Sequence, residues 1–182
     1  GRQFDVIVDS SGRTLTDTQS VVAITGAPRH RLVYVSSAGV YADNARLPLD
    51  ESAPTDPASR HAGKADTEAW LRSEGIPFTS FRPTYIYGPG NYNPVERWFF
   101  DRITHDRPVP LPGDGSTITQ LGHVDDLAEA MARWLRCAAT AARNEGAAAG
   151  EGGGGQRGGA GRRNPRLDPD CSVGVPGHAA AI

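Results

Sequence analysis

The sequence predicts an α/β protein with a parallel sheet covered by helices, followed by a disordered tail. Short apolar runs typical of buried strands alternate with stretches of helical period over the first 136 residues. These runs are continuously apolar, as strands buried on both faces of a parallel sheet are. The composition then changes near Cys137, which predicts the tail. The 182 residues are about one domain in length.

The first half of the chain predicts two strands and two helices. A β-branched run that ends in polar turn residues predicts a strand at Phe4–Ser11. Apolar spacing predicts a helix over residues 15–26, a second buried strand at Arg31–Ser37 and a second helix over residues 57–75. A glycine ends each helix. The side chains of the second helix expected to face the sheet are Ala62, Ala65, Ala69 and Trp70.

The second half continues the alternation. Pro77–Gly88 is expected to be a third strand that runs into a loop, and Asn93–Asp106 is expected to be a helix. Residues 116–136 predict a short strand and then a helix capped by Asp125 or Asp126. Three aromatic residues are expected to pack in the core or along their helix: Trp98, Phe99 and Phe100.

Two units follow from composition: a partial nucleotide-binding domain at 1–136 and a low-complexity tail at 137–182. The tail holds 11 glycines and 11 alanines among 46 residues and has almost no apolar periodicity, so it cannot bury enough surface to order itself. Both cysteines, Cys137 and Cys171, lie in it, and without a visible secretory leader we expect free thiols. The tail resembles GC-rich sequence translated out of frame, so we expect a fragment with a shifted frame at its end.

Charge and hydropathy narrow the classes of partner. The tail has five arginines and four acids, so the 19 basic and 21 acidic residues of the chain leave 14 against 17 for residues 1–136, a net charge of −3. A body that is not basic lacks a general electrostatic footprint for nucleic acid. No apolar run approaches the roughly 20 residues of a membrane helix, so we expect no membrane partner.

Polar or glycine-rich segments follow each predicted strand, at Asp9–Gly12, Ser36–Tyr41 and Pro83–Gly90. Ligands of open parallel sheets bind beyond the carboxyl ends of the strands, which is where these segments meet. Lys64, on the intervening helix, is the single lysine among 19 basic residues. A compact ammonium makes several separate hydrogen bonds in a way that arginine does not, so Lys64 is a site candidate. No metal site is predicted.

Five stretches carry a family resemblance: "DVIVDSSG", "YVSSAGVY", the lysine of "RHAGK", "FRPTYIYGPG" and "LGHVDDLAEAM". In this order and spacing they resemble the extended short-chain dehydrogenase/reductases, the epimerase and dehydratase group. The resemblance implies the C-terminal part of a Rossmann-like, doubly wound parallel sheet over residues 4–136. It also implies an NAD or NADP cofactor, with contacts from Ser10, Gly12, Ser36, Lys64 and Pro83.

The same resemblance assigns the catalytic positions. The family uses a tyrosine phenolate, whose pKa a neighbouring ammonium lowers, together with a serine hydroxyl that contacts the substrate oxygen. By position the serine is Ser37 and the lysine is Lys64, but the tyrosine position is Arg60. Arginine stays protonated and cannot be the base. His61 is the substitute candidate, favoured in its neutral form by Lys64; the alternative is a partly exposed helix histidine.

Substrate and cofactor capacity depart from the family pattern. Where relatives contact the nucleotide-sugar through an asparagine after the third strand, this chain has Tyr85, and Arg60 adds a fixed charge at the pocket mouth that suits a phosphate or carboxylate. The family's glycine-rich strand–turn–helix does not precede Phe4. We therefore expect weak or no NAD(P) binding by this chain alone, with a Kd above about 10 μM, which is roughly 7 kcal/mol. We also expect an open sheet edge where the third strand of the family should lie.

"SSAGVY", "SRHAGK" and "GPGNYNPVERWFF" look most like the chloroplast stem-loop-binding proteins and their cyanobacterial relatives. That subgroup implies structured RNA or a ribosome as partner and the chloroplast stroma or bacterial cytoplasm as location. Three hypotheses stand: a family protein with a degenerate catalytic centre, an RNA-binding or RNA-cleaving protein using His61 and His123, and an assembly factor without chemistry. His123 is otherwise expected to bond backbone at a strand-to-helix junction. The sequence names neither a substrate nor an oligomeric state.

Overall fold

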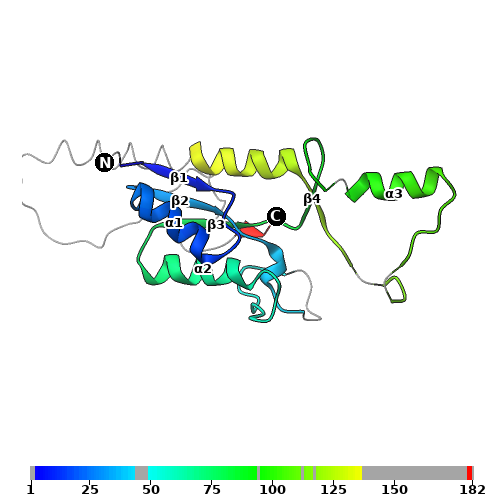
Figure 1. The fold of residues 1–182 in the computed structure, drawn as a ribbon, viewed down its shortest axis with the longest axis horizontal. Helices are drawn as coiled ribbons and strands as arrows, with labels where there is room; N and C mark the ends of the chain where they lie inside the picture. Colours follow the sequence, from blue (N-terminus) through cyan, green and yellow to red (C-terminus); the bar gives the residue numbers. More distant parts are fainter. Residues whose placement is uncertain are drawn as a thin grey trace, which may run out of the picture.

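A parallel sheet forms the centre of the molecule (Figure 1). The computed structural model describes residues 3–43, 49–93, 95–111, 113–116 and 118–136, with the backbone of 180–181. The strands β1 (Val6–Asp9), β2 (Arg31–Val35), β3 (Phe78–Arg82) and β6 (Ala180–Ala181) lie in that order, each parallel to its neighbour. Within the described chain β1 pairs with β2 alone, so β1 is an edge of this sheet.

Helices cover both faces of the sheet. On one face α1 (Leu15–Thr25) and α2 (Ala62–Ser73) pack on Leu32 and Tyr34 of β2. On the other face the helix over residues 124–136 packs on alternate side chains of β2 and β3. The buried residues of the two clusters are Ile7, Leu32, Tyr34 and Leu71 on the first face and Val33, Phe81 and Trp134 on the second. The doubly wound α/β prediction is therefore confirmed.

The ends of α1 follow from local chemistry. The Asp17 carboxylate accepts hydrogen bonds from the backbone N–H groups of Arg13 and Thr14, which caps the start of the helix. Gly26 ends it with φ +74°, a conformation that other residues rarely adopt. The stop predicted at Gly26 is confirmed. The C-cap residue of α2 is Glu74 rather than the predicted Gly75, which follows it with φ +65°.

The second predicted helix is shorter than the sequence pattern suggests. It begins at Ala62 rather than near residue 57, because Asp56 accepts a hydrogen bond from the Ala58 N–H and holds the intervening residues in turns. The buried face was also predicted wrongly at Ala69, which is exposed. The buried side chains of α2 are Thr67, Glu68 and Leu71.

The third predicted strand divides in two. Pro83 has no N–H to give to a ladder, and β3 stops just before it. The chain resumes as β4 (Tyr85–Tyr87), which pairs in parallel with β5 (Leu121–His123) in a separate two-stranded sheet. A helix follows at once over residues 124–136, so Asp125 and Asp126 lie in its first turn and do not precede it as caps. There their charge suits the positive end of the helix dipole.

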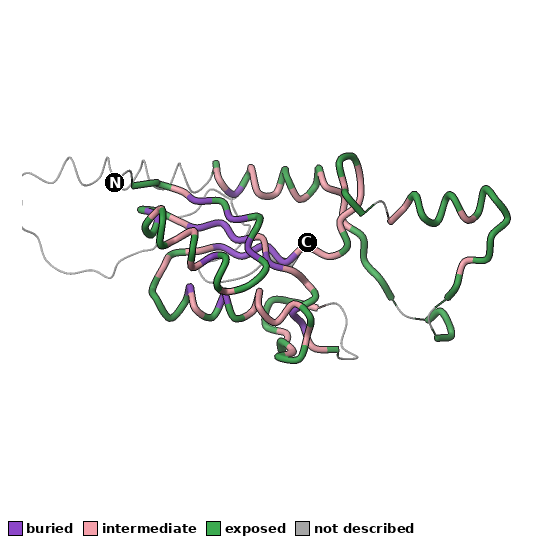
Figure 2. The backbone as a smooth tube through the Cα atoms, in the orientation of Figure 1, coloured by how far each residue is buried: buried purple, intermediate pink, exposed green. Residues whose placement is uncertain are grey.

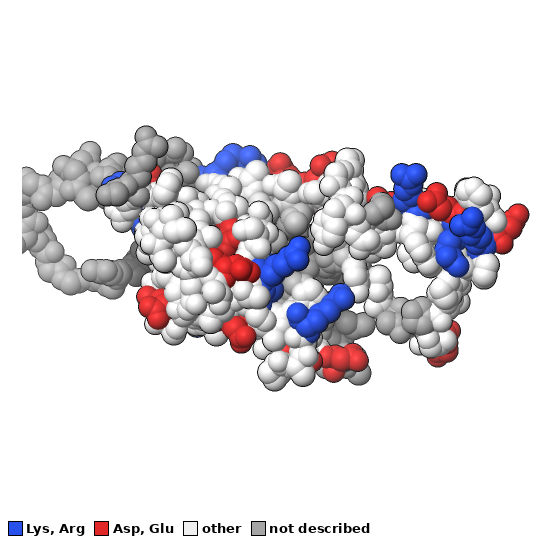
Figure 3. Space-filling view, in the orientation of Figure 1, with Lys and Arg blue, Asp and Glu red and all other residues white. Residues whose placement is uncertain are grey.

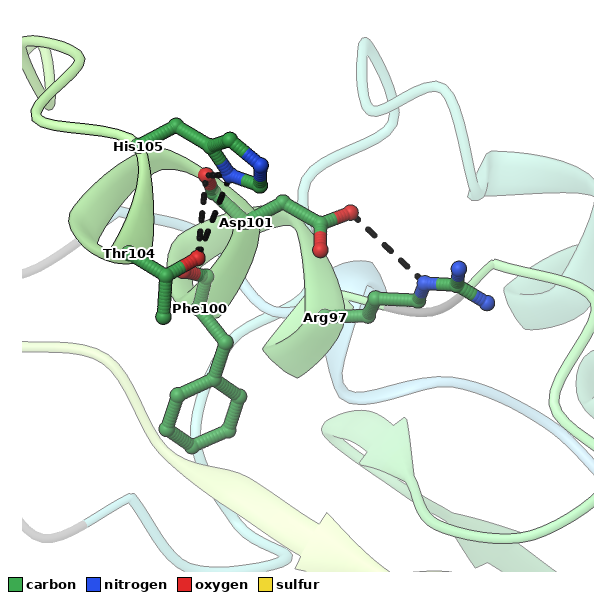
Figure 4. Close-up of polar contacts among 5 residues, drawn as sticks. All are labelled: Arg97, Phe100, Asp101, Thr104 and His105. Carbon is green, nitrogen blue, oxygen red and sulfur yellow. Dashed lines mark hydrogen bonds and ion pairs between the residues drawn. The ribbon is translucent and has the colours of Figure 1, made fainter.

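The helix α3 (Val95–Thr104) and the chain after it extend away from the sheet (Figures 1 and 2). None of its described residues is buried, so packing in the core, one of the two alternatives expected for its aromatic residues, is wrong: Phe100 is 64% exposed. The other alternative, packing along the helix, is seen for Trp98, whose ring contacts Phe99 and Arg102. Figure 4 shows the polar contacts of this helix, where Asp101 pairs with Arg97 and its carbonyl contacts the His105 ring.

Most of the tail lies outside the described residues. The predicted disorder of 137–182, and the expected free thiols of Cys137 and Cys171, fall there, apart from the backbone of β6. Among the helices of the described ranges, none is long and apolar enough to cross a membrane.

Candidate functional site

The carboxyl ends of β1, β2 and β3 meet at one edge of the sheet, as parallel pairing requires. The Ser36 N–H donates to the Phe81 carbonyl at 2.7 Å, and the Ala38 N–H donates to the Pro83 carbonyl at 2.9 Å. These two bonds join the segment after β2 to the end of β3. The edge is the candidate site, since ligands of open parallel sheets bind there.

The loop after β1 is organised by a buried carboxylate. Asp9 Oδ1 accepts from the N–H groups of Ser11 and Gly12, and its Oδ2 accepts from the Thr18 hydroxyl at 2.7 Å. Burial alone would raise the pKa of Asp9, but these hydrogen bonds outweigh it and hold the pKa below its ordinary value. A Cβ on Gly12 would lie 2.5 Å from Thr18 Oγ1, so the close loop requires glycine there.

The Gly12 loop is also tied to β2. The Tyr34 hydroxyl donates to the Gly12 carbonyl at 3.1 Å. Burial raises the pKa of Tyr34 to about 12, so this phenol stays protonated and keeps donating. This bond holds Gly12 beside β2, whereas Ser10, the other cofactor residue predicted in this loop, is exposed.

Lys64 lies in the first turn of α2 and points to this edge. Its Nζ donates to the Val35 carbonyl at 2.6 Å and lies 5.0 Å from the centre of the Tyr34 ring. Burial is the largest cause of its lowered pKa; Arg13 lowers it further, while Asp9 opposes the shift. The ammonium is therefore fixed at the last residue of β2, and its remaining protons can serve a ligand.

Arg60 and His61 precede α2, and His61 is its N-cap residue rather than a residue within the helix. The Arg60 Nε donates to His61 Nε2 at 3.0 Å. The imidazole packs so closely on Gly39 that a Cβ there would lie 2.4 Å from the ring. Burial, then Arg60 and Lys64, lower the pKa of His61, which favours its neutral form as the sequence predicts.

Ser37 is bound into the backbone around it. Its Oγ accepts from the Gly39 N–H at 3.1 Å and caps η1 (Ala38–Val40). Ser59 joins this turn to the Arg60 segment, since its hydroxyl donates to the Gly39 carbonyl at 2.6 Å and accepts from the His61 N–H. The structure thus brings the turns of Ser37 and His61 together.

Tyr85 does not belong to this cluster of contacts. It lies on β4, which pairs with β5, and it is 53% exposed. The ring of His123 packs edge-on against Tyr87, at 5.1 Å between centres. His123 Nδ1 accepts from the Asp125 N–H at 3.2 Å, which confirms the predicted backbone-bonding role at the strand-to-helix junction.

Sequence reasoning missed the buried polar residues beneath the edge. Glu68, Ser80 and Arg82 form one hydrogen-bonded group between α2 and β3. The spacing of Glu68, one helical turn after Lys64, was the available signal. In the part of the chain that the structure covers, no group of three His, Cys, Asp or Glu residues is arranged to hold a metal ion.

Comparison with known proteins begins with a family model described as "NAD dependent epimerase/dehydratase family", which matches residues 13–146. The chain is 49% identical over 128 residues to the chloroplast stem-loop binding protein of 41 kDa b of Arabidopsis thaliana, a match that covers 70% of this chain and 33% of that protein. It is 32% identical over 114 residues to a probable UDP-glucuronate 4-epimerase of Rhizobium meliloti, with 59% and 33% covered. The chain spans about a third of the length of these relatives.

Solved structures agree on the fold. A variant of UDP-glucuronic acid 4-epimerase from Bacillus cereus, in complex with a UDP-sugar and NAD, superposes with a TM-score of 0.60 at 17% identity, covering 72% of this chain and 49% of that one. A dTDP-glucose 4,6-dehydratase from Bacillus anthracis in complex with NAD gives a TM-score of 0.56 at 23% identity, covering 70% and 46%. At these identities the likeness supports the fold alone.

Proposed function

Because the chain belongs to the NAD dependent epimerase/dehydratase family, we propose that its carboxyl edge is the ribose-binding end of an NAD(P) site with a degenerate catalytic centre. One observation carries the proposal: the only lysine of the chain is fixed by the Val35 carbonyl at the edge where the strand-end loops meet. Ser10, Gly12, Ser36 and Pro83 lie in the loops or strand ends around it and complete the proposed cofactor contacts.

The catalytic centre is degenerate because Arg60 takes the position of the proton-transferring tyrosine. A guanidinium stays protonated at physiological pH and cannot accept a proton. His61 has the lowered pKa of a base, but its Nε2 already accepts a hydrogen bond from Arg60. With Ser37 engaged by backbone, we expect no ordinary dehydrogenase turnover. The guanidinium suits a phosphate or carboxylate of the substrate, and Tyr85 is the proposed contact for a nucleotide-sugar.

The sole lysine gives a direct test of the ribose contact. Selective ¹³C-lysine labelling gives one set of side-chain signals, because Lys64 is the only lysine, and it leaves the ammonium unmodified. We expect NAD⁺ at millimolar concentration to shift the Lys64 signal, and AMP, which lacks the nicotinamide ribose, to leave it unchanged. We take a Kd of about 1 mM as the weakest binding that would count as a contact. If 10 mM NAD⁺, about ten times that Kd, leaves the Lys64 signal unshifted, the proposed contact is overturned. A Kd below about 10 μM by calorimetry would overturn the expected weak binding.

The degenerate centre is tested by Arg60→Tyr. In a chain long enough to hold the whole family domain, this change supplies the missing phenol beside Lys64. We expect NAD(P)-linked oxidation or reduction of a nucleotide-sugar to appear in the variant and to be undetectable in the parent. Arg60→Phe is the matched control, because it has the ring without the hydroxyl. Turnover by the unaltered Arg60 protein would show that the centre is not degenerate.

RNA binding is the second candidate function, and a non-catalytic assembly role is compatible with it. The observation that favours RNA is the 49% identity to a protein named for stem-loop binding and for the chloroplast. In that case we place the chain in the chloroplast stroma or a bacterial cytoplasm. Acidic and basic side chains are interspersed over the face in Figure 3. Residues 1–136 carry 14 basic against 17 acidic residues, a net charge of −3. The charge distribution therefore favours a small RNA-contacting surface over a broad basic one.

A salt series separates this candidate from the first. Filter binding of a stem-loop RNA is measured from 20 to 200 mM salt. The logarithm of the binding constant falls with the logarithm of the salt concentration, by about 0.9 for each phosphate contacted in a duplex, so the slope gives the number of phosphates. We expect Arg60→Ala to reduce the slope by about 1. Arg97→Ala is the control, since Arg97, in the first turn of α3, is paired with Asp101 and lies on the helix that extends away from the sheet. No binding at the lowest salt would exclude the candidate.

A further inference from the structure

A buried carboxylate lies under the candidate site. Glu68, on α2, is 3% exposed and accepts three hydrogen bonds from β3. Ser80 Oγ donates to its Oε1 at 2.8 Å, Arg82 Nε donates to the same oxygen at 3.1 Å, and Arg82 Nη2 donates to Oε2 at 2.5 Å. Burial alone would raise the pKa of Glu68, but the hydrogen bonds to the carboxylate and the charge of Arg82 together outweigh it and keep the carboxylate charged.

The geometry of this pair fixes a helix on a strand. A bidentate arginine–carboxylate contact holds both position and direction, which a sliding apolar contact does not. Apolar packing tolerates small shifts of a helix. A buried ion pair resists such shifts, because separating its partners leaves uncompensated charges inside the protein. Glu68 follows Lys64 by four residues, so both lie on the same side of α2, one turn apart. The contact that sets the place of Glu68 therefore also sets the place of Lys64.

Arg82 carries the link onward to the turn of Ser37. Its guanidinium carbon lies 4.8 Å from the centre of the Tyr41 ring, and both residues are buried. Tyr41 is the C-cap residue of η1, and η1 carries the Gly39 on which the His61 ring packs. One buried group thus touches α2, β3 and the turn that contacts His61.

We propose that Glu68, Ser80 and Arg82 are positioning residues, which set α2 on β3 so that Lys64 stays at the Val35 carbonyl and His61 stays on Gly39. The importance of this placement for a ligand rests on the proposed function, but the placement itself does not. The alternative is that the group contributes to the stability of the fold and has no particular effect on the edge.

A role in stability alone predicts an unchanged pKa of Lys64, whereas a charge effect and a positioning role predict opposite changes. The charged and titratable groups near its ammonium are Asp9 on β1, Arg13 and Asp17 at the start of α1, Tyr34 on β2, and His61 and Glu68 at the start and in the middle of α2. If Glu68 acts only through its charge, removing that charge lowers the pKa of Lys64. If Glu68 holds α2 in place, its loss releases Lys64 from its half-buried position, and the pKa rises toward about 10.4.

The experiment is a pH titration of the ¹³Cε signal of the unmodified Lys64 in the full 182-residue chain, without ligand. We expect the pKa to rise in Glu68→Gln and, by less, in Ser80→Ala. Ser80→Ala changes no charge, so a charge effect predicts no shift there. A fall in Glu68→Gln, or an unchanged value in Ser80→Ala, overturns the proposal.

Leu71→Ala is the control for lost stability. Leu71 is fully buried on the same helix but belongs to the apolar cluster, so we expect the folded Leu71→Ala protein to keep the Lys64 pKa of the parent. An equal rise in Leu71→Ala would show that any weakening of α2 moves Lys64, and would overturn the proposal. If Glu68→Gln loses the dispersed spectrum of a folded protein, Ser80→Ala alone decides. Because no NAD or RNA is added, a failure here is distinct from a failure of the proposed function.

Discussion

The sheet body and the α3 arm, defined as residues 95–120 without 112 and 117, show two ways in which one chain treats the same residue types. In the body, Phe81 is fully buried and Arg82 pairs with Glu68 inside the protein. In the arm, Phe100 is 64% exposed and Arg97 pairs with Asp101 in solvent. The contrast shows that the type of a residue does not by itself set its contribution to stability in this protein. That contribution depends on whether the side chain is buried against another element.

The largest difference is expected between two phenylalanines. Phe81→Ala leaves a cavity between β3 and Trp134 and should destabilise the protein by about 4–5 kcal/mol, near the upper end for buried phenylalanine. Phe100→Ala removes a side chain already in solvent and should change stability by less than about 0.5 kcal/mol. Urea unfolding followed by tryptophan fluorescence measures both. Similar losses for the two variants would mean that α3 packs on the body in solution.

The two ion pairs should differ almost as much. Glu68→Gln breaks a buried pair and leaves Arg82 without its counter-charge, at a cost of about 3–4 kcal/mol. Asp101→Asn breaks an exposed pair at i,i+4 and should cost about 0.3–0.5 kcal/mol. Urea unfolding at 0.1 and 1 M NaCl checks the comparison, because only the exposed pair is screened by salt. A salt-sensitive loss in Glu68→Gln would contradict the burial of that pair.

Asp9 gives the body a pH dependence of intermediate size. Its folded pKa lies below the ordinary value, so its stabilising effect is present above the unfolded pKa of about 3.9 and is lost as pH falls through the folded pKa. Asp9→Asn should therefore lower stability by about 1.5–3 kcal/mol at pH 7, the range for hydrogen bonds to a charged group. The difference in free energy of unfolding between parent and variant should shrink as the pH falls below about 4. A difference that is constant from pH 7 to pH 3 would show that ionisation is not involved.

The smallest effect is expected at the end of α3. The His105 ring contacts the Asp101 carbonyl at 2.8 Å and so satisfies one of the last carbonyls of the helix (Figure 4). His105→Ala should change global stability by less than about 0.5 kcal/mol. It should instead speed amide hydrogen exchange in α3 while leaving β2 protected. Faster exchange in both regions would show that the arm and the body unfold as one unit.

Sequence patterns located the candidate edge because it depends on local features. Polar segments after apolar strands, a single lysine and an arginine four residues before it are all visible in the chain. What the patterns misplaced were boundaries and burial. The turns after Asp56 start α2 at Ala62, so His61 is a cap, and Pro83 divides the predicted strand Pro77–Gly88 between two sheets.

The sequence by itself determined the α/β alternation, the glycine stop of α1, the family motifs and the residue types at the edge, since each depends on neighbours in the chain. Only the tertiary structure decided that Glu68 and Arg82 are buried together and that the α3 aromatics are exposed. The reason is physical: burial depends on which distant surfaces meet. Glu68 on α2 and Arg82 on β3 are joined by the packing of a helix on a sheet, and helical or strand periodicity carries no record of that partner.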